Sequence, residues 1–261
     1  MGRCSASGPN FPYATSRRRR SRIASKEVNR RAGEFIQARL HPELDPLFGG
    51  AGLVSMIDER DPQVVSIRYP AAFSQAYIRP DVRLEIGPLA SWVPSAPQPI
   101  RPYAAEVFPR LFRDPVASVI TIAAERTFWE KATILHQEAH RPGLPPERYS
   151  RHYYDLYKLA ASTVRQRSLA EMGLLEDVVR FKMRFYPSRW ARYDLAAPGT
   201  FHLLPADAAK IANLERDYHS MEVMLFGEVP EFEAVKAGLK GLEAEINASR
   251  PVVKALEFRA G

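Results

Sequence analysis

The sequence has only one cysteine among its 261 residues, Cys4, so the chain cannot form an internal disulfide. A chain without disulfides fits a reducing compartment, and we expect a cytoplasmic location. The sequence also lacks an apolar run of the roughly 18–20 residues that a membrane-spanning helix needs. Its start lacks the apolar segment of a signal peptide. We therefore expect no membrane partner.

Acidic residues are almost missing from the start of the chain. Residues 1–31 contain nine Arg or Lys and one acid, Glu27, whereas the rest contains 28 basic and 29 acidic groups. The net charge of +7 therefore comes from the start. The run R-R-R-R-S-R, residues 17–22, would attract phosphates, but such a run is also typical of a solvated segment that resists packing. Both interpretations stay open, and we expect residues 1–20 to be a disordered basic start.

The hydrophobic pattern divides the remaining chain into a part with strands and a part with helices. Helical spacing predicts a helix over 21–40 that ends at H-P-E-L-D-P. Runs of β-branched or alternating residues predict strands over 52–57, 64–69, 77–86 and 117–122, with a proline-rich connector over 88–102. Further helices are predicted over 123–140, 148–163, 168–185, 206–225 and 230–248. The sequence thus predicts an α+β fold, with a small antiparallel sheet in a lobe over 21–122 and a helical domain over 123–261.

Two of the predicted helices supply a lysine and an aspartate that could act on a phosphate. Lys131 lies on the apolar side of its helix, and Asp155 lies between Tyr154 and Leu156. The loop between the helices, R-P-G-L-P-P-E, cannot be helical, so we expect the helices to lie side by side and the two charges to meet. A lysine there can pair with a triphosphate. The alternatives are a lysine that reaches out to water and a structural ion pair of Asp155 with an arginine.

Other polar residues are candidate metal ligands. Glu85 follows Arg83 by two residues, so both point to the same side of a strand, and a carboxylate fixed in this way can hold Mg²⁺. The alternative is a solvent-facing ion pair on a half-exposed sheet. His136 and His140 have the spacing of two zinc ligands on a helix, but Gln137 follows the first histidine and no third ligand is evident. We therefore interpret them as a polar helix end.

Three stretches together resemble a known family: A-E-R-T-F-W-E-K-A-T-I-L-H, R-Y-S-R-H-Y-Y-D-L and Y-I-R-P-D-V-R-L-E-I-G. In combination they are similar to the AbiEii/AbiGii-type nucleotidyltransferase toxins of type IV toxin–antitoxin and phage-abortive systems. The resemblance extends over residues 16–247. It implies a polymerase-β-like nucleotidyltransferase lobe followed by a helical bundle, and Mg²⁺-dependent transfer of a nucleotide from an NTP to an acceptor such as tRNA. A cognate antitoxin is the implied protein partner.

The resemblance also assigns roles to residues of this chain. Lys131 matches the lysine that contacts the nucleotide, and Asp155 matches the late catalytic aspartate. Glu85 lies on the strand where a third acidic group could bind metal. The arginines near these motifs would bind substrate, and they are Arg83, Arg126, Arg148 and Arg151.

One motif of such enzymes is missing. They begin with a Gly-Gly or Gly-Ser turn followed by a strand Arg-x-(Ser/Thr)-x-Asp-x-Asp, and this sequence contains no such element. We therefore expect a truncated lobe, impaired transfer activity, and self-association through an exposed strand edge. The alternative is a catalytically inactive remnant that acts as a nucleic-acid-binding or partner-binding protein.

Overall fold

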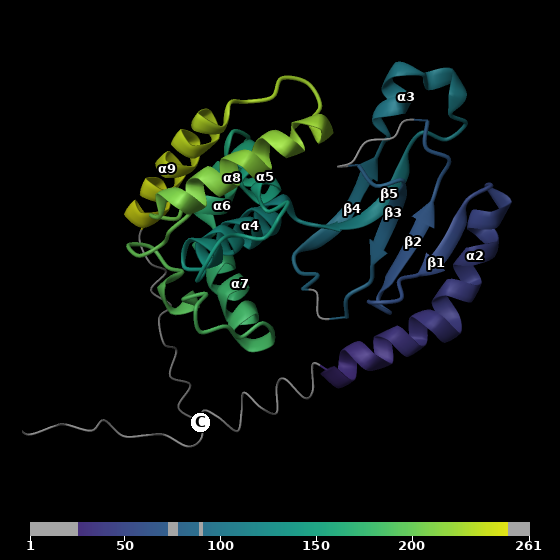
Figure 1. Ribbon diagram of the computed structural model, residues 1–261, viewed down its shortest axis with the longest axis horizontal. Coiled ribbons are helices and arrows are strands. Elements are labelled where there is room, and N and C mark those ends of the chain that lie inside the picture. The colour runs from purple at the N-terminus through teal and green to yellow at the C-terminus, as the bar shows by residue number, and fades with distance from the viewer. Residues whose placement is uncertain (1–25, 73–77, 89–90, 250–261) are drawn as a thin grey trace, which may run out of the picture. The chain divides into compact units, whose positions relative to one another are not determined.

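The computed structural model describes residues 26–72, 78–88 and 91–249. The chain forms two compact units, Met1–Ala90 and Ser91–Gly261, whose elements are labelled in Figure 1. The first unit combines a helix with a three-stranded sheet, and the second combines a two-stranded sheet with a helical bundle. The predicted α+β fold class is confirmed.

The helix of the first unit continues beyond the point where the sequence predicts its end. Residues 26–35 are α-helical, Ile36–Leu40 is a π-helix, and α2 covers His41–Gly50. The prediction that H-P-E-L-D-P ends the helix is therefore wrong. Pro42 lies in the first turn of α2, directly after a π turn that the His41 amide closes on the Ile36 carbonyl. Because this turn already departs from the regular α-helical ladder, the missing amide of Pro42 removes little there.

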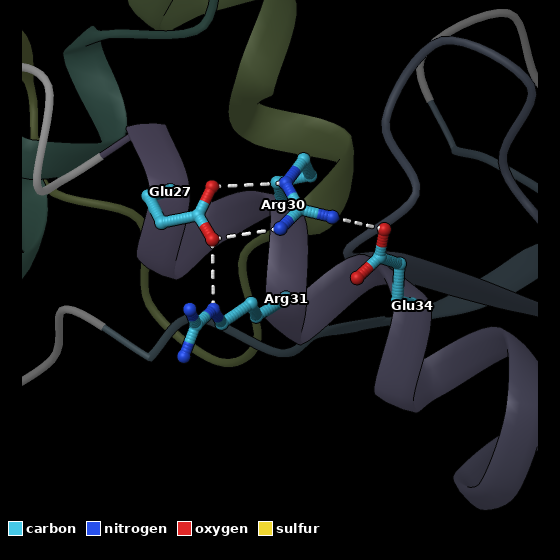
Figure 2. A network of polar contacts seen from close by, with 4 residues as sticks. All are labelled: Glu27, Arg30, Arg31 and Glu34. Carbon is cyan, nitrogen blue, oxygen red and sulfur yellow. Dashed lines mark hydrogen bonds and ion pairs between the residues drawn. The ribbon is translucent and has the colours of Figure 1, made fainter.

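Intrahelical ion pairs neutralise part of the positive charge on residues 26–35. Glu27 accepts hydrogen bonds from Arg30 (2.7 and 2.9 Å) and from Arg31 (2.8 Å), and Arg30 also contacts Glu34 (Figure 2). These bonds, first from Arg30 and then from Arg31, lower the pKa of Glu27 to about 2. The exposed side of the helix therefore carries both signs of charge over these residues. The R-R-R-R-S-R run lies outside the described residues.

The sheet of the first unit is antiparallel in the order β1-β2-β3, as predicted. Its strands are β1 (Val54–Ile57), β2 (Val64–Arg68) and β3 (Asp81–Glu85). The central strand β2 is buried over its first four residues. The helix is joined to β1 by Ser55, whose hydroxyl lies 3.1 Å from His41 Nε2 and donates to Asp45.

The proline-rich connector contains a strand that the sequence did not predict. β4 (Ser95–Ile100) pairs antiparallel with β5 (Ala117–Ile122), and the second of these strands was predicted. The Ala123 amide donates to the Pro94 carbonyl (2.8 Å). In an antiparallel ladder, opposing residues alternate between hydrogen-bonded and non-hydrogen-bonded pairs, so every second pair of β4 and β5 counted from Pro94 is hydrogen-bonded. Pro97 and Pro99 fall on the other pairs, where an amide points away from β5 and is not needed. The helix α3 (Tyr103–Val107) and the 3₁₀ turn η2 (Pro109–Leu111) lie between the two strands.

The helical bundle begins at α4, directly after the hairpin. Its helices are α4 (Ala124–Ala139), α5 (Ser150–Ala160), α6 (Val164–Ala170), α7 (Met172–Phe185), α8 (Ala208–Met221) and α9 (Phe232–Ala248). The chain leaves helical geometry at Glu171 (φ −113°, ψ 56°), so α6 and α7 are separate helices, which the sequence did not predict. Helix α4 is central, since Phe128, Trp129 and Leu135 are completely buried. Among the described residues, no helix combines the length and the apolar character needed to cross a bilayer.

Candidate functional site

Helices α4 and α5 bring Lys131 and Asp155 into direct contact. The ammonium Nζ of Lys131 lies 2.6 Å from Oδ2 of Asp155 and 3.0 Å from Nδ1 of His152. The side chains of Lys131 and Asp155 are 22% and 40% exposed, so solvent reaches the ion pair. The side-by-side arrangement of the two helices, which the proline-rich loop predicted, therefore occurs at these two residues.

His152 stands beside the ion pair as a neutral ring. Burial lowers its pKa to about 3, and the positive charges of Lys131, Arg151 and Lys182 contribute to the same shift. The ring is therefore uncharged near neutral pH, and its Nδ1 can accept a hydrogen bond from Lys131. Arg151, one of the predicted substrate-binding arginines, is exposed on α5 and acts electrostatically on this ring.

A second lysine, which the sequence analysis missed, reaches the same turn of α4. Lys182 is 8% exposed, and its Nζ donates a hydrogen bond to the carbonyl of Glu130 (3.1 Å). Burial lowers its pKa to about 8. A signal for it exists in the sequence, because Leu175, Val178 and Lys182 follow one another at helical spacing on the buried side of α7. A lysine on an apolar stripe is unusual enough to be noticed.

Arg126 is buried on α4, five residues before Lys131. Its Nη1 donates to the carbonyl of Val93 (2.7 Å), its Nε donates to Glu130 (3.2 Å), and its guanidinium lies over the ring of Phe181. It therefore joins α4 to the segment that precedes β4. A role in substrate binding stays a prediction for this residue.

Six residues of α4, α5 and α7 form what we term the α4–α5–α7 cluster: Arg126, Glu130, Lys131, His152, Asp155 and Lys182. It contains three cations, two carboxylates and a neutral histidine, so one positive charge is in excess. An excess cation at a partly exposed site favours an anionic ligand.

Arg148 lies two residues before α5 and has a left-handed backbone (φ 64°). Its amide donates to Oδ1 of Asp217 (2.7 Å), and the Ser150 amide donates to Oδ2 (2.9 Å). Asp217, from α8, thus acts as the cap of α5. No sequence pattern connects two groups so far apart in the chain. The predicted contact of the Arg148 side chain with substrate stays a prediction.

Arg83 and Glu85 lie on β3, in the first unit. Arg83 forms an ion pair with Asp58 (Nη2–Oδ2 3.1 Å), in which both side chains are 28% exposed. Glu85 is exposed at the end of its strand. Within the described ranges, no three His, Cys, Asp or Glu side chains gather as ligands of a metal ion. These residues alone therefore do not fit a magnesium site, and metal binding at Glu85 stays a prediction.

The histidine pair of α4, His136 and His140, lies among other aromatic rings. His136 is completely buried, accepts the His202 amide at Nδ1 (3.1 Å) and lies 3.0 Å from the Arg192 carbonyl through Nε2. Burial lowers its pKa to about 4. Its ring packs against His140 at a centroid distance of 4.6 Å. Because both ring nitrogens of His136 contact the backbone, this histidine joins α4 to the chain that follows α7.

The sequence matches the family model described as the nucleotidyl transferase AbiEii toxin of a type IV toxin–antitoxin system, over residues 12–239. A comparison with curated proteins finds no match, and a comparison with solved structures finds none either. The matched range includes all the residues of the α4–α5–α7 cluster and confirms the resemblance seen in the sequence. Since it covers more than half of the chain, the protein belongs to the AbiEii family of nucleotidyl transferase toxins.

Proposed function

We propose that this protein transfers a nucleotide from an NTP to an acceptor such as tRNA, as a cytoplasmic toxin opposed by a cognate antitoxin. The family membership supports the reaction class. The observation that carries the proposal for the site is the contact of Lys131 with Asp155 in a cluster with an excess positive charge. That charge suits the phosphates of an NTP.

Each member of the ion pair has a chemical role in this proposal. Lys131 exchanges part of its contact with Asp155 for a phosphate oxygen of the NTP, as a charged donor does readily. The carboxylate of Asp155 then takes the proton of the acceptor hydroxyl. The acceptor oxygen forms a bond to the α-phosphorus, the bond from that phosphorus to the bridging oxygen breaks, and pyrophosphate leaves. His152 stays neutral and keeps the ammonium in place.

Mg²⁺ belongs to the proposal on family grounds alone. The described residues do not gather a ligand set for it, so no step of the proposed mechanism depends on a metal held by them. Glu85 remains the proposed protein ligand, and Arg83 the proposed contact with substrate on the same strand.

The test is transfer of label from α-labelled NTPs to bulk tRNA with the full chain and Mg²⁺. We expect Lys131→Met and Asp155→Asn each to lower the rate by about 100-fold or more, the usual range for a lost proton-transfer or charge contact. Lys158→Met is the matched control, since Lys158 is exposed on α5 one turn after Asp155. Labelling that persists in both site variants would refute the assignment of the site.

A second function is favoured by the basic start of the chain. If the wild-type chain transfers no nucleotide but shifts tRNA in a gel at low salt, the protein is a binding remnant rather than an active enzyme. Replacing the arginines of residues 17–22 with glutamine should then abolish binding, because phosphate contacts by such residues provide nonspecific affinity.

A further inference from the structure

Lys182 occupies a position that an apolar residue would fill at lower cost. It continues the buried side of α7 after Leu175 and Val178, where an apolar side chain is the usual occupant. Burying an ammonium is unfavourable unless charges and hydrogen bonds compensate for the lost water. Within the part of the chain that the structure describes, the ammonium of Lys182 donates one hydrogen bond, to the Glu130 carbonyl, which is a neutral acceptor. An ammonium has three donors, so Lys182 has donors to spare for a ligand.

The surroundings of Lys182 point to an anion as that ligand. From α4, Arg126 and Lys131 oppose its charge and Glu130 supports it. On α5, the charges of Lys131, Arg151 and Lys182 all lower the pKa of His152. Cations outnumber acids on α4, and they do so in the cluster as a whole even when Asp155 of α5 is counted. A phosphate group entering here would relieve the repulsion between the cations as well as accept their hydrogen bonds.

We propose that Lys182 is a second phosphate-binding lysine, which holds the triphosphate of the NTP together with Lys131. The inference rests on the proposed function, because it names a further contact with the same substrate. The geometry supports it in one specific way: Lys182 is bonded to the carbonyl of Glu130, the residue directly before Lys131. Lys182 is thus held at the turn of α4 that carries Lys131, and the charges of the two lysines act on each other.

The experiment measures binding of inorganic tripolyphosphate to the full chain by isothermal titration calorimetry, without metal and without an acceptor. We expect Lys182→Met to weaken binding by about 10-fold or more, the usual effect of losing a charged hydrogen bond. Lys182→Arg keeps the charge and should retain most of the affinity. Lys240→Met, at an exposed lysine of α9, should bind as the wild type does.

A pH series separates a ligand contact from a structural role. The wild-type affinity should fall relative to that of Lys182→Arg as the pH rises past 8, because Lys182 loses its proton in that range and arginine does not. Comparing the two proteins cancels the protonation of the ligand itself. A wild type that follows the arginine variant from pH 7 to pH 9 overturns the inference, even if the methionine variant fails to fold.

Lys131→Met distinguishes failure of this inference from failure of the proposed function. If Lys131→Met abolishes binding while Lys182→Met binds as the wild type does, Lys182 is not a phosphate ligand and the proposed function stands. If the wild type binds no tripolyphosphate, or if both variants bind it normally, the proposed site fails together with the inference.

Discussion

Replacing His136 with glutamine should make the free energy of unfolding less dependent on pH in the acidic range. His136 is neutral and completely buried, with Nδ1 accepting the His202 amide and Nε2 in contact with the Arg192 carbonyl. A proton added to Nδ1 would break the bond from His202 and place a charge in the core. The native state therefore binds this proton only at low pH.

The size of the effect follows from the two pKa values. Burial, the largest cause, lowers the pKa of His136 from 6.5 to about 4. Between these two values the unfolded chain holds a proton on His136 and the folded chain does not. The stability that depends on neutral His136 is thus complete above pH 6.5 and is lost as the pH falls towards 4. One pKa unit corresponds to about 1.4 kcal/mol, so the loss amounts to about 3 kcal/mol.

Urea unfolding at pH 7, 6, 5 and 4, followed by tryptophan fluorescence, measures this loss. The three tryptophans, Trp92, Trp129 and Trp190, all belong to the second unit, so their signal reports on the unit that contains His136. At pH 7 we expect His136→Gln to be less stable by about 1–3 kcal/mol, because the His202 amide loses its acceptor. At pH 4 this difference should disappear or reverse. A difference that stays constant from pH 7 to pH 4 would refute the reasoning.

Three further predictions concern stability and use the same unfolding assay. Asp217→Ala should cost about 1–3 kcal/mol, because the amides that open α5 lose their cap; a loss below 0.5 kcal/mol would contradict this. Gly238→Ala should destabilise the protein by about 1–3 kcal/mol, since the added Cβ would lie 2.7 Å from the ring of Tyr157. Gly241→Ala, on the same helix, adds a Cβ that meets nothing within 4 Å and should stabilise the protein by up to about 1 kcal/mol. Equal effects of the two glycine substitutions would show that Gly238 of α9 does not pack against Tyr157 of α5. Lys182→Met should stabilise the protein by up to about 3 kcal/mol at pH 7, because burial lowers the pKa of Lys182 from 10.5 to about 8 and the folded wild type holds a charged ammonium at a cost. This advantage of the variant should fade between pH 8 and 10.5, where the folded wild type has lost the proton that the unfolded chain still holds.

Local patterns in the sequence were enough to predict most of the secondary structure. The spacing of apolar residues located the long helices of the second unit but missed α3 and the separate α6, and the alternation of β-branched residues located the sheet of the first unit. Two of the errors arose because proline was given too much weight. The prediction ended the first helix too early at Pro42, because the π turn before this proline could not be foreseen from the sequence. The prolines of residues 95–100 also argued against a strand there. Only the pairing with β5 shows that Pro97 and Pro99 occupy positions whose backbone nitrogen would point away from β5.

The sequence by itself determined the identity of Lys131 and Asp155 as neighbours, since a short loop rich in proline forces two consecutive helices together. It determined the family as well, through motifs that are contiguous in the chain. Only the tertiary structure decided which distant residues join them. Lys182 and Asp217 reach α4 and α5 from helices that come much later. Helical periodicity shows which side of a helix is buried but not which helix covers it, so contacts of this kind depend on how the whole bundle packs.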